Sequence, residues 1–190
     1  MGWKGFFYKA FEWLIFQFAF DHYTCSSLYT MNSLRLHFGI SDEKLTTTYA
    51  GIDYNLWDPT TVSTQTTDAL KAKYNLQNSF IGLYFGRPGV AKGLSDFLRA
   101  VPLISENIPH FKAFLIVPKG EKSSSGGIKS TVSNDEVTQL IDRLGIQEHV
   151  IWIDGIPYNQ LKEYVMMADV VVLPTLAEGF GLAIAEVCAL

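Results

Sequence analysis

Residues 80–117 read FIGLYFGRPGVAKGLSDFLRAVPLISENIPHFKAFLIV, and this stretch decides the fold. Two apolar runs, Phe80–Gly86 and Phe111–Val117, have the length and composition of buried strands. Between them, apolar residues recur at intervals of three and four, which is the stripe of an amphipathic helix. A strand, a helix and a second strand in this order predict a parallel βαβ unit. The residues of the helical stripe are Leu94, Phe97, Leu98 and Val101.

The same alternation continues toward the end of the chain. Ser133 followed by Glu136 has the pattern of a capping box, which marks the start of a helix. Further strands are predicted at His149–Ile153 and Val170–Leu173, each followed by a helical segment. The sequence therefore predicts an α/β fold whose open, mostly parallel sheet is covered by helices on both faces. Ligands of such sheets bind beyond the carboxyl ends of the strands. The loops at those ends start at Gly86, Pro118, Asp154 and Pro174.

The first 60 residues differ from this repeat. After an aromatic helix, they predict a short strand at His22–Ser26, a helix from Ser27 to Phe38 and a brief extended segment at Thr46–Ala50. Residues 58–74 contain many threonines, and their apolar residues follow no strong helical or strand period, so we expect a linker there. The predicted organisation is an N-terminal region at 1–57 that lies outside the repeat, a linker at 58–74, and an α/β domain at 75–190.

Composition excludes several classes of function. The 190 residues are 48% hydrophobic, which is enough to bury a core and rules out general disorder. Fifteen Lys and Arg against nineteen Asp and Glu give a net charge of −4, so no basic footprint of nucleic-acid binding is present. Cys25 and Cys188 match no zinc or redox spacing, and a cytoplasmic, reducing location fits them. Gly120–Ser130 lacks the Gly-Lys-Ser/Thr spacing of a phosphate-binding P-loop.

Residues 1–20 are rich in Phe and Trp, but Lys4, Lys9 and Glu12 interrupt them, so a spanning helix is not predicted. A signal peptide is not predicted either, because Ala19-Phe20-Asp21 makes a poor cleavage site. The favoured interpretation is a helix buried along one apolar stripe. The alternative is a helix lying on a membrane surface, with its lysines facing anionic lipid. The stripe consists of Phe7, Phe11, Leu14, Ile15 and Phe18.

The loop at residues 86–93, GRPGVAKG, joins the first strand of the repeat to its helix. It places Arg87 and Lys92 five positions apart, just before a helix N-terminus. A helix start offers unpaired N–H groups and the positive end of a dipole, and Arg and Lys add charge-assisted hydrogen bonds. Together these groups would suit a diphosphate. The alternative is that both cations are ordinary surface residues.

The segment at residues 174–186, PTLAEGFGLAIAE, follows the last strand. Glu178 would lie at the ligand-facing edge, where its two oxygens could accept hydrogen bonds from neighbouring hydroxyls of a sugar. Its alternative role is that of an acid favoured by the helix dipole. Glu186 lies in an otherwise apolar helix, and because burying an unpaired carboxylate is costly, a functional role is favoured. Gly179 and Gly181 let the backbone approach a ligand closely.

The segment from Glu178 to Glu186 resembles the two-glutamate signature of retaining, nucleotide-sugar glycosyltransferases of the GT-B fold, family 4. Two departures stand out: Ala50 occupies a position where Asn is usual, and Pro118-Lys119-Gly120 replaces a glycine-rich loop. Four upstream segments are similar to that family's landmarks, in the same order: HYTCSSLYTMNSLRLHFGI (22–40), TTYAGIDYNLWDP (47–59), YFGRPGVAKGLSDFLRA (84–100) and WIDGIPYNQLKEYVMMADVVVLP (152–174).

The resemblance implies a Rossmann-like donor domain and a role for each matching residue. Arg87 and Lys92 would bind the donor diphosphate and neutralise the leaving group, and Glu178 would bind hydroxyls of the donor sugar, so these three are the expected catalytic residues. Glu186 would bind the nucleotide ribose. The expected substrate-binding set is Gly86, Arg87, Lys92, Glu178, Gly179, Phe180, Gly181, Leu182 and Glu186.

The resemblance also implies which residues lie near the nucleotide base and that no metal is needed. Asp154–Ile156 would lie near the base, mostly through its backbone. Tyr158 could stack on the base, although a helix-start aromatic packed on the sheet is the favoured interpretation. No cofactor or divalent metal is expected, and the sequence has no Asp-x-Asp triplet to hold one.

The implied reaction is transfer of a hexose from a UDP-, GDP- or ADP-sugar, with retention, to a glycan, lipid or small-molecule acceptor. Residues 1–57 would be the end of the N-terminal acceptor domain plus the crossover, and 75–190 a donor domain truncated at its C-terminus. The isolated chain is therefore expected to be an inactive fragment of a cytoplasmic enzyme, with peripheral membrane contact through 1–20. The open alternatives are a non-catalytic nucleotide-sugar-binding fragment and a membrane-surface interaction module.

Overall fold

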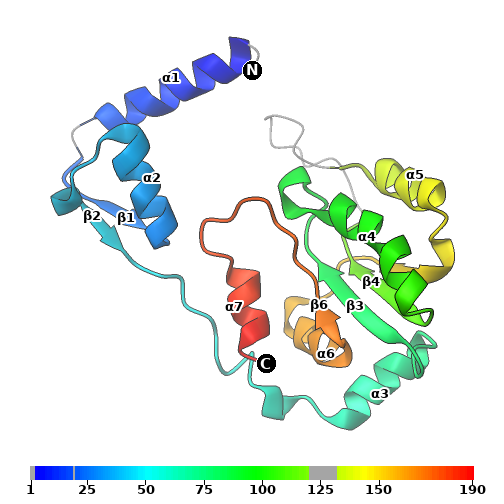
Figure 1. Ribbon diagram of the computed structural model, residues 1–190. Coiled ribbons are helices and arrows are strands. Elements are labelled where there is room, and N and C mark those ends of the chain that lie inside the picture. The colour runs from blue at the N-terminus through cyan, green and yellow to red at the C-terminus, as the bar shows by residue number, and fades with distance from the viewer. Residues whose placement is uncertain (1–2, 19, 120–131) are drawn as a thin grey trace. The chain divides into compact units, whose positions relative to one another are not determined.

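The computed structural model describes residues 3–18, 20–119 and 132–190 (Figure 1). The Gly120–Ser130 segment, for which no P-loop is predicted, lies outside these residues. The chain divides into two compact units. The N-terminal unit comprises residues 1–51 with 179–182, and the C-terminal unit comprises residues 52–178 with 183–190.

The described residues of the N-terminal unit form two α-helices, one 3-10 turn and a pair of short parallel strands. Ser27 caps the second helix by accepting a hydrogen bond from the Thr30 N–H, and Gly39 ends it in the left-handed conformation. The predicted strand and helix of this region are therefore confirmed within a residue or two. The elements are α1 (Trp3–Gln17), β1 (Tyr23–Cys25), α2 (Leu28–Phe38), η1 (Asp42–Lys44) and β2 (Leu45–Thr47).

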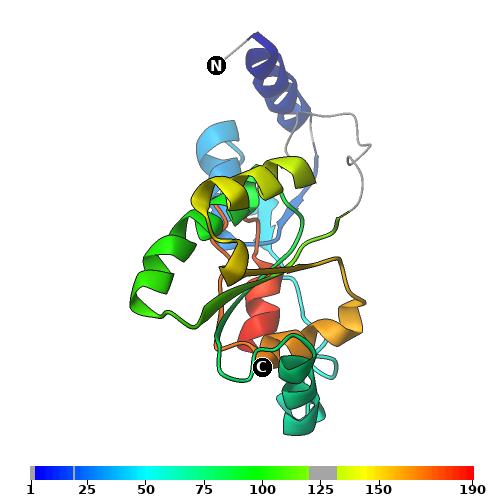
Figure 2. The same cartoon turned by 90° about the vertical axis from the view of Figure 1, so that its right-hand side faces the viewer.

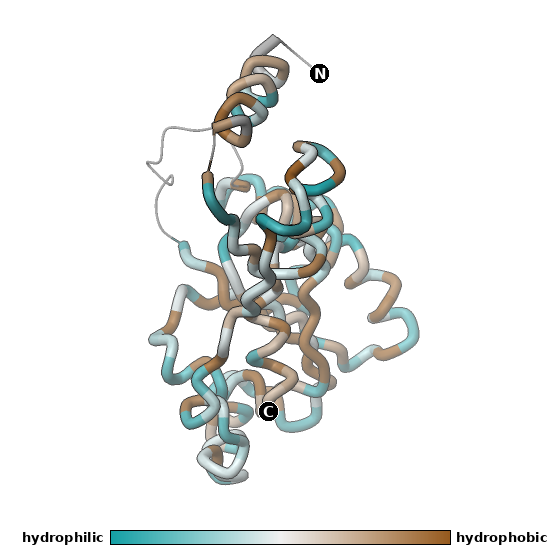
Figure 3. The backbone as a smooth tube through the Cα atoms, turned by 90° about the vertical axis from the view of Figure 1, so that its left-hand side faces the viewer, coloured by the Kyte–Doolittle hydropathy of each residue, from teal (hydrophilic) through white to brown (hydrophobic). Residues whose placement is uncertain are grey.

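The prediction that α1 buries an apolar stripe is wrong. Phe11 and Phe18 are 63% and 62% exposed, and Phe7, Leu14 and Ile15 are exposed as well. In Figure 3, much of this helix has the brown colour of hydrophobic residues, interrupted by paler and teal stretches. The periodicity of the apolar residues indicates which side chains share a stripe, but it does not say whether another element covers them. No helix within the described residues is both long and apolar enough to cross a membrane.

The C-terminal unit is built on a four-stranded parallel sheet (Figures 1 and 2). Its strand order is β5-β4-β3-β6, so the chain builds the sheet outward from β3 in one direction and then returns to its other side. The register aligns Phe80 with Phe111 and Gly82 with Val170. The strands are β3 (Phe80–Phe85), β4 (Phe111–Ile116), β5 (Val150–Ile153) and β6 (Val170–Val171).

Helices cover both faces of this sheet, which confirms the predicted fold class. Because side chains alternate along a strand, Tyr84 packs in the core on one face and Leu83 in the core on the other. The first face is covered by α4 (Leu94–Asn107) and α5 (Asn134–Leu144), and the second packs against α6 (Leu161–Met167) and the end of α7 (Leu182–Cys188). The predicted capping box of α5 is confirmed, with Ser133 and Glu136 each bonding the other's backbone N–H.

Residues 58–74, expected to be a linker, contain regular structure. Asp58 caps a 3-10 turn, η2 (Pro59–Thr61), by accepting from the Thr60 N–H. Ser63 then caps α3 (Thr64–Lys73), which packs through Leu70 on the same core as α6. The threonines hide this helix from sequence analysis, because they favour caps and turns and weaken its apolar period.

Candidate functional site

The candidate site lies where β3 and β6 leave the sheet. These strands are neighbours, but the chain passes from β3 to β4 on one side and reaches β6 on the other. In open parallel sheets, ligands bind beyond the carboxyl ends of the strands at such a change of direction. The loops that follow β3 and β6 are the ones that carry Arg87, Lys92 and Glu178.

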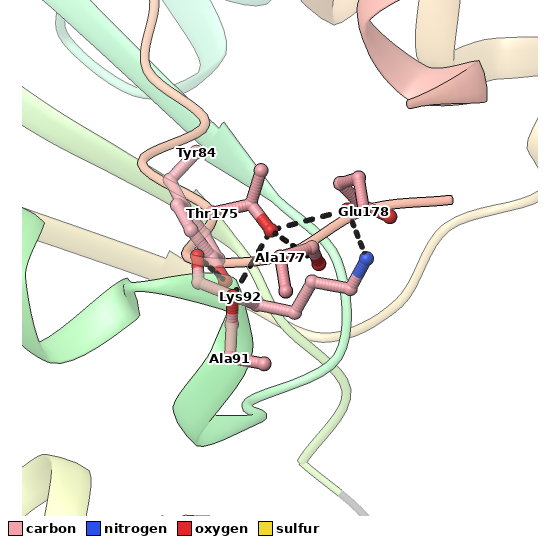
Figure 4. Close-up of polar contacts among 6 residues, drawn as sticks. All are labelled: Tyr84, Ala91, Lys92, Thr175, Ala177 and Glu178. Atoms are coloured by element: carbon pink, nitrogen blue, oxygen red, sulfur yellow. Dashed lines mark hydrogen bonds and ion pairs between the residues drawn. The ribbon is translucent and has the colours of Figure 1, made fainter. Parts of the chain in front are cut away.

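Two hydrogen bonds to the carbonyl of Ala91 hold these two loops together, and Figure 4 shows the one from the Thr175 hydroxyl. The Leu176 N–H donates to the carbonyl of Ala91 at 2.8 Å, and the Thr175 hydroxyl lies 3.0 Å from the same oxygen. Gly93 has a φ of +68°, and a Cβ at this position would lie 1.9 Å from the carbonyl oxygen of Pro174. Glycine is therefore required at position 93 both by conformation and by the closeness of the second loop.

Lys92 and Glu178 form an ion pair between the two loops (Figure 4). Their side chains are 43% and 31% exposed, so the pair is accessible to solvent. Thr175 lies beside it, with its hydroxyl 3.2 Å from Glu178 Oε1. An ammonium group has three donors, so Lys92 can hold Glu178 and still donate to another anion.

A hydrogen bond connects the backbone carbonyl of Lys92 to strand β3. It accepts a hydrogen bond from the hydroxyl of Tyr84, a buried residue of β3. Burial raises the pKa of Tyr84 to about 12, so its hydroxyl stays a donor through the neutral range. The base of the lysine's loop is therefore fixed, while its side chain remains exposed.

Gly86 and Arg87 occupy the first turn after β3. Gly86 has a φ of +134°, and its N–H donates to the carbonyl of Ile116 at 3.1 Å. Arg87 is exposed, and it forms no ion pair within the described part of the chain. The structure thus brings Lys92 and Glu178 into contact and leaves the Arg87 guanidinium available at the start of the same loop.

Glu186 is buried in α7, with 6% of its surface exposed. It accepts a hydrogen bond from the hydroxyl of Tyr158, which in turn accepts from the indole N–H of Trp57 at 3.1 Å. Burial, and then the hydrogen bond to Glu186, raise the pKa of Tyr158. No hydrogen bond or ion pair joins Glu186 to Lys92 or Glu178 in the regions that the structure describes.

Tyr158 is not the sheet-packed aromatic that the favoured interpretation expects. It lies in the short turn η5 (Tyr158–Gln160) after β5 and is 53% exposed. Its ring meets the ring of Trp57 edge-on, with centroids 5.8 Å apart. Sequence analysis missed its pairing with Glu186, because 28 residues separate the two and no local pattern connects them.

Residues 179–182 group with the N-terminal unit. There the ring of Phe180 lies 6.0 Å from the ring of Tyr49, and Gly181 has a φ of +82°. A Cβ on Gly179 would lie 3.4 Å from the Ser26 hydroxyl. Leu182, the last member of the expected set, is exposed at the first position of α7.

Asp154 orders the loop expected near the base. Its carboxylate accepts hydrogen bonds from the backbone N–H groups of Lys119 and Gly155, at 2.8 and 2.7 Å. The bond from Lys119, and then the one from Gly155, hold the pKa of Asp154 below its usual range. The carboxyl ends of β4 and β5 are therefore joined through one side chain.

Comparison with known proteins identifies the family. Residues 66–190 match the family described as Glycosyl transferases, group 1. The chain belongs to this family. This result agrees with the resemblance drawn from the two glutamates and from the order of the upstream segments, and the structural neighbours support the GT-B type of fold.

Curated relatives within the family are longer than this chain. The chain is 27% identical, over 88% of its length, to D-inositol 3-phosphate glycosyltransferase of Streptomyces scabiei and covers 36% of that protein. It is 32% identical, over 62% of its length, to the protein of the same name from Streptomyces coelicolor and covers 25% of it. The chain thus spans about a third of these relatives or less.

Solved structures share the fold at lower identity. Anabaena HepE, in complex with UDP-glucose, superposes with a TM-score of 0.75 at 19% identity, over 95% of this chain and 46% of that one. Sucrose-phosphate synthase from Thermosynechococcus elongatus gives a TM-score of 0.73 at 22% identity, over 94% of this chain and 41% of that one.

Proposed function

We propose that this chain provides the donor-binding part of an enzyme that transfers a hexose from a nucleoside-diphosphate sugar, with retention, to an acceptor. The observation that carries the proposal is the contact of Lys92 with Glu178 where the loops after β3 and β6 meet. A cation and a carboxylate side by side match the two ends of a sugar diphosphate. Family membership and the UDP-glucose complex of HepE support this choice of donor.

The chemistry asked of these residues is electrostatic. As the bond between the sugar carbon and the phosphate oxygen breaks, negative charge develops on the diphosphate and positive charge on the sugar ring. Arg87 and Lys92 would stabilise the departing diphosphate by charge-assisted hydrogen bonds. Glu178 would hold hydroxyls of the sugar through the carboxylate oxygen that Lys92 does not engage. The new bond forms between the sugar carbon and an acceptor oxygen, whose proton is released.

Arg87, Lys92 and Glu186 supply the binding test. Isothermal titration calorimetry of the 190-residue chain with UDP, GDP and ADP would measure affinity directly. We expect Arg87→Ala, Lys92→Met and Glu186→Ala each to weaken binding by about 1–3 kcal/mol, the range for hydrogen bonds to charged groups. Because two cations are expected to neutralise the diphosphate, binding should persist in EDTA.

Two cations outside the candidate site serve as matched controls. Lys112 lies near the amino end of β4, where it donates to the carbonyl of Glu148, and Arg143 lies at the end of α5. Lys112→Met and Arg143→Ala remove the same charges without touching the loops after β3 and β6. Equal affinity in the wild type and the three site variants would reject the proposal, as would losses of the same size in the controls.

We further propose that the isolated chain binds the donor without turning it over. It covers 36% of one curated relative and 25% of another, so most of each relative's chain lies outside the matched region. Release of free nucleotide or of labelled sugar product by the purified 190-residue chain would contradict this. It would also exclude the alternative of a non-catalytic binding fragment.

A second candidate function is peripheral contact with a membrane through α1. The observation that favours it is the exposure of Phe6, Phe11 and Trp13, which are 71%, 63% and 52% exposed. Aromatic and aliphatic side chains on an exposed helix partition into the boundary between lipid headgroups and acyl chains. Flotation with phosphatidylglycerol vesicles should capture the full chain and lose it when residues 1–20 are deleted. Capture that survives the deletion would exclude α1 as the contact.

A further inference from the structure

Trp57, Tyr158 and Glu186 form a hydrogen-bonded relay on the face of the sheet that α6 covers. The three residues come from separate segments: the stretch before α3, the turn η5 after β5, and α7. Trp57 is fully buried, and Glu186 is 6% exposed, so both ends of the relay are held inside the protein. The relay therefore joins parts of the chain up to 129 positions apart.

The chemistry of the three groups sets the direction of the relay. An indole N–H can only donate, so the oxygen of Tyr158 must accept from Trp57. The phenol proton is then directed to Glu186, and an ionised carboxylate can only accept. Trp57 thus orients the phenol, and the phenol orients the carboxylate.

Burial and packing make this arrangement rigid. Trp57 lies in the hydrophobic cluster of that face, and the edge-on contact of its ring with Tyr158 fixes the turn that carries the phenol. Burial raises the pKa of Tyr158, so the phenol keeps its proton through the neutral range. Tyr158 donates to Glu186 Oε1, and no hydrogen bond to Oε2 is found among the described residues.

We propose that Tyr158 is a positioning residue that holds one oxygen of Glu186, so that the other is presented in a single orientation to the vicinal hydroxyls of the nucleotide ribose. The inference rests on the proposed function, in which Glu186 contacts the ribose. A carboxylate on a flexible side chain loses rotamer freedom when it binds a ligand, and a fixed hydrogen bond removes part of that cost beforehand. Tyr158 therefore acts through Glu186, without contacting the sugar itself.

The test compares a nucleotide that carries the ribose diol with one that lacks it. Whichever of UDP, GDP and ADP binds the wild-type chain most tightly is titrated beside its 2′,3′-dideoxy analogue. The wild type should prefer the natural nucleotide. In Tyr158→Phe, that preference should fall by about fivefold to tenfold, which lies within the range for immobilising one side chain on binding. The affinity for the dideoxy analogue should stay within about twofold of the wild-type value.

Two further variants separate positioning from folding. Tyr74→Phe removes a comparable phenol hydrogen bond, 3.3 Å long to Tyr164, on the same face of the sheet without touching Glu186. It should leave the diol preference unchanged. Trp57→Phe keeps an aromatic ring but loses the N–H, so it should reduce the preference less than Tyr158→Phe does. It also serves if Tyr158→Phe does not fold, with thermal unfolding as the check on folding.

Three outcomes would overturn the inference in distinguishable ways. An unchanged diol preference in Tyr158→Phe, or an equal loss for both ligands, would show that Tyr158 does not position Glu186. A wild type that binds nucleotide without preferring the diol would remove the role of Glu186 toward the ribose. A wild type that binds none of the three nucleotides would reject the proposed function itself, and this inference with it.

Discussion

Replacing Gly93 by alanine tests whether the two loops of the candidate site are as closely joined as the structure indicates. The added Cβ would lie 1.9 Å from the carbonyl oxygen of Pro174 and 2.7 Å from its carbonyl carbon, whereas real Cβ atoms essentially never approach within 3.0 Å. Both neighbours are backbone atoms, which cannot rotate away. The loop after β6 must therefore move by about 1 Å or more relative to the loop after β3.

Two costs add in Gly93→Ala. A residue with a side chain loses about 1–2 kcal/mol in the left-handed conformation that Gly93 adopts at φ +68°. Forcing packed backbone apart costs a further 1–3 kcal/mol or so. The free energy of unfolding should therefore fall by about 2–5 kcal/mol, a large part of the roughly 5–15 kcal/mol that stabilises a typical domain.

Gly145→Ala is the matched control. Gly145 ends α5 at φ +64°, and nothing lies within 4 Å of the Cβ that it would gain. It should therefore show the conformational cost alone, about 1–2 kcal/mol. Urea unfolding followed by tryptophan fluorescence measures both variants, and nucleotide titration of Gly93→Ala should show weakened binding because Lys92 is displaced. If the two substitutions cost the same, the close approach of Pro174 is refuted.

Three further predictions concern stability. Lys92→Met should change the free energy of unfolding by less than about 1 kcal/mol, because its ion pair with Glu178 is solvent-exposed, and a larger loss in urea unfolding would contradict this. Ser133→Ala removes the cap of α5 and should cost about 1 kcal/mol by the same measurement. The raised pKa of Tyr84 means that the folded state favours its neutral form, so this stabilisation is present below pH 10 and is lost as the pH rises toward about 12. Alkaline unfolding should therefore be less steep in Tyr84→Phe than in the wild type, and identical pH profiles would count against the burial of this phenol.

Local patterns predicted much of the C-terminal unit. The apolar runs at Phe80 and Phe111 become β3 and β4, and Ser133 with Glu136 caps α5 as its spacing indicates. These features depend on residues a few positions apart, where sequence spacing translates directly into geometry. The helix at residues 64–73 was not predicted, because its threonines weaken the local apolar spacing on which such predictions depend.

The sequence by itself determined most of the elements of the C-terminal unit, their alternation, and which charged residues fall in loops after strands. Only the tertiary structure decided that β6 pairs with β3, and so that Lys92 meets Glu178 across 86 positions. It also decided that Trp57 donates to Tyr158 and Tyr158 to Glu186, and that the apolar side chains of the α1 stripe are exposed. The reason is physical: helix and strand periods are properties of the local backbone, whereas the partner of a side chain depends on which surfaces the whole chain brings together.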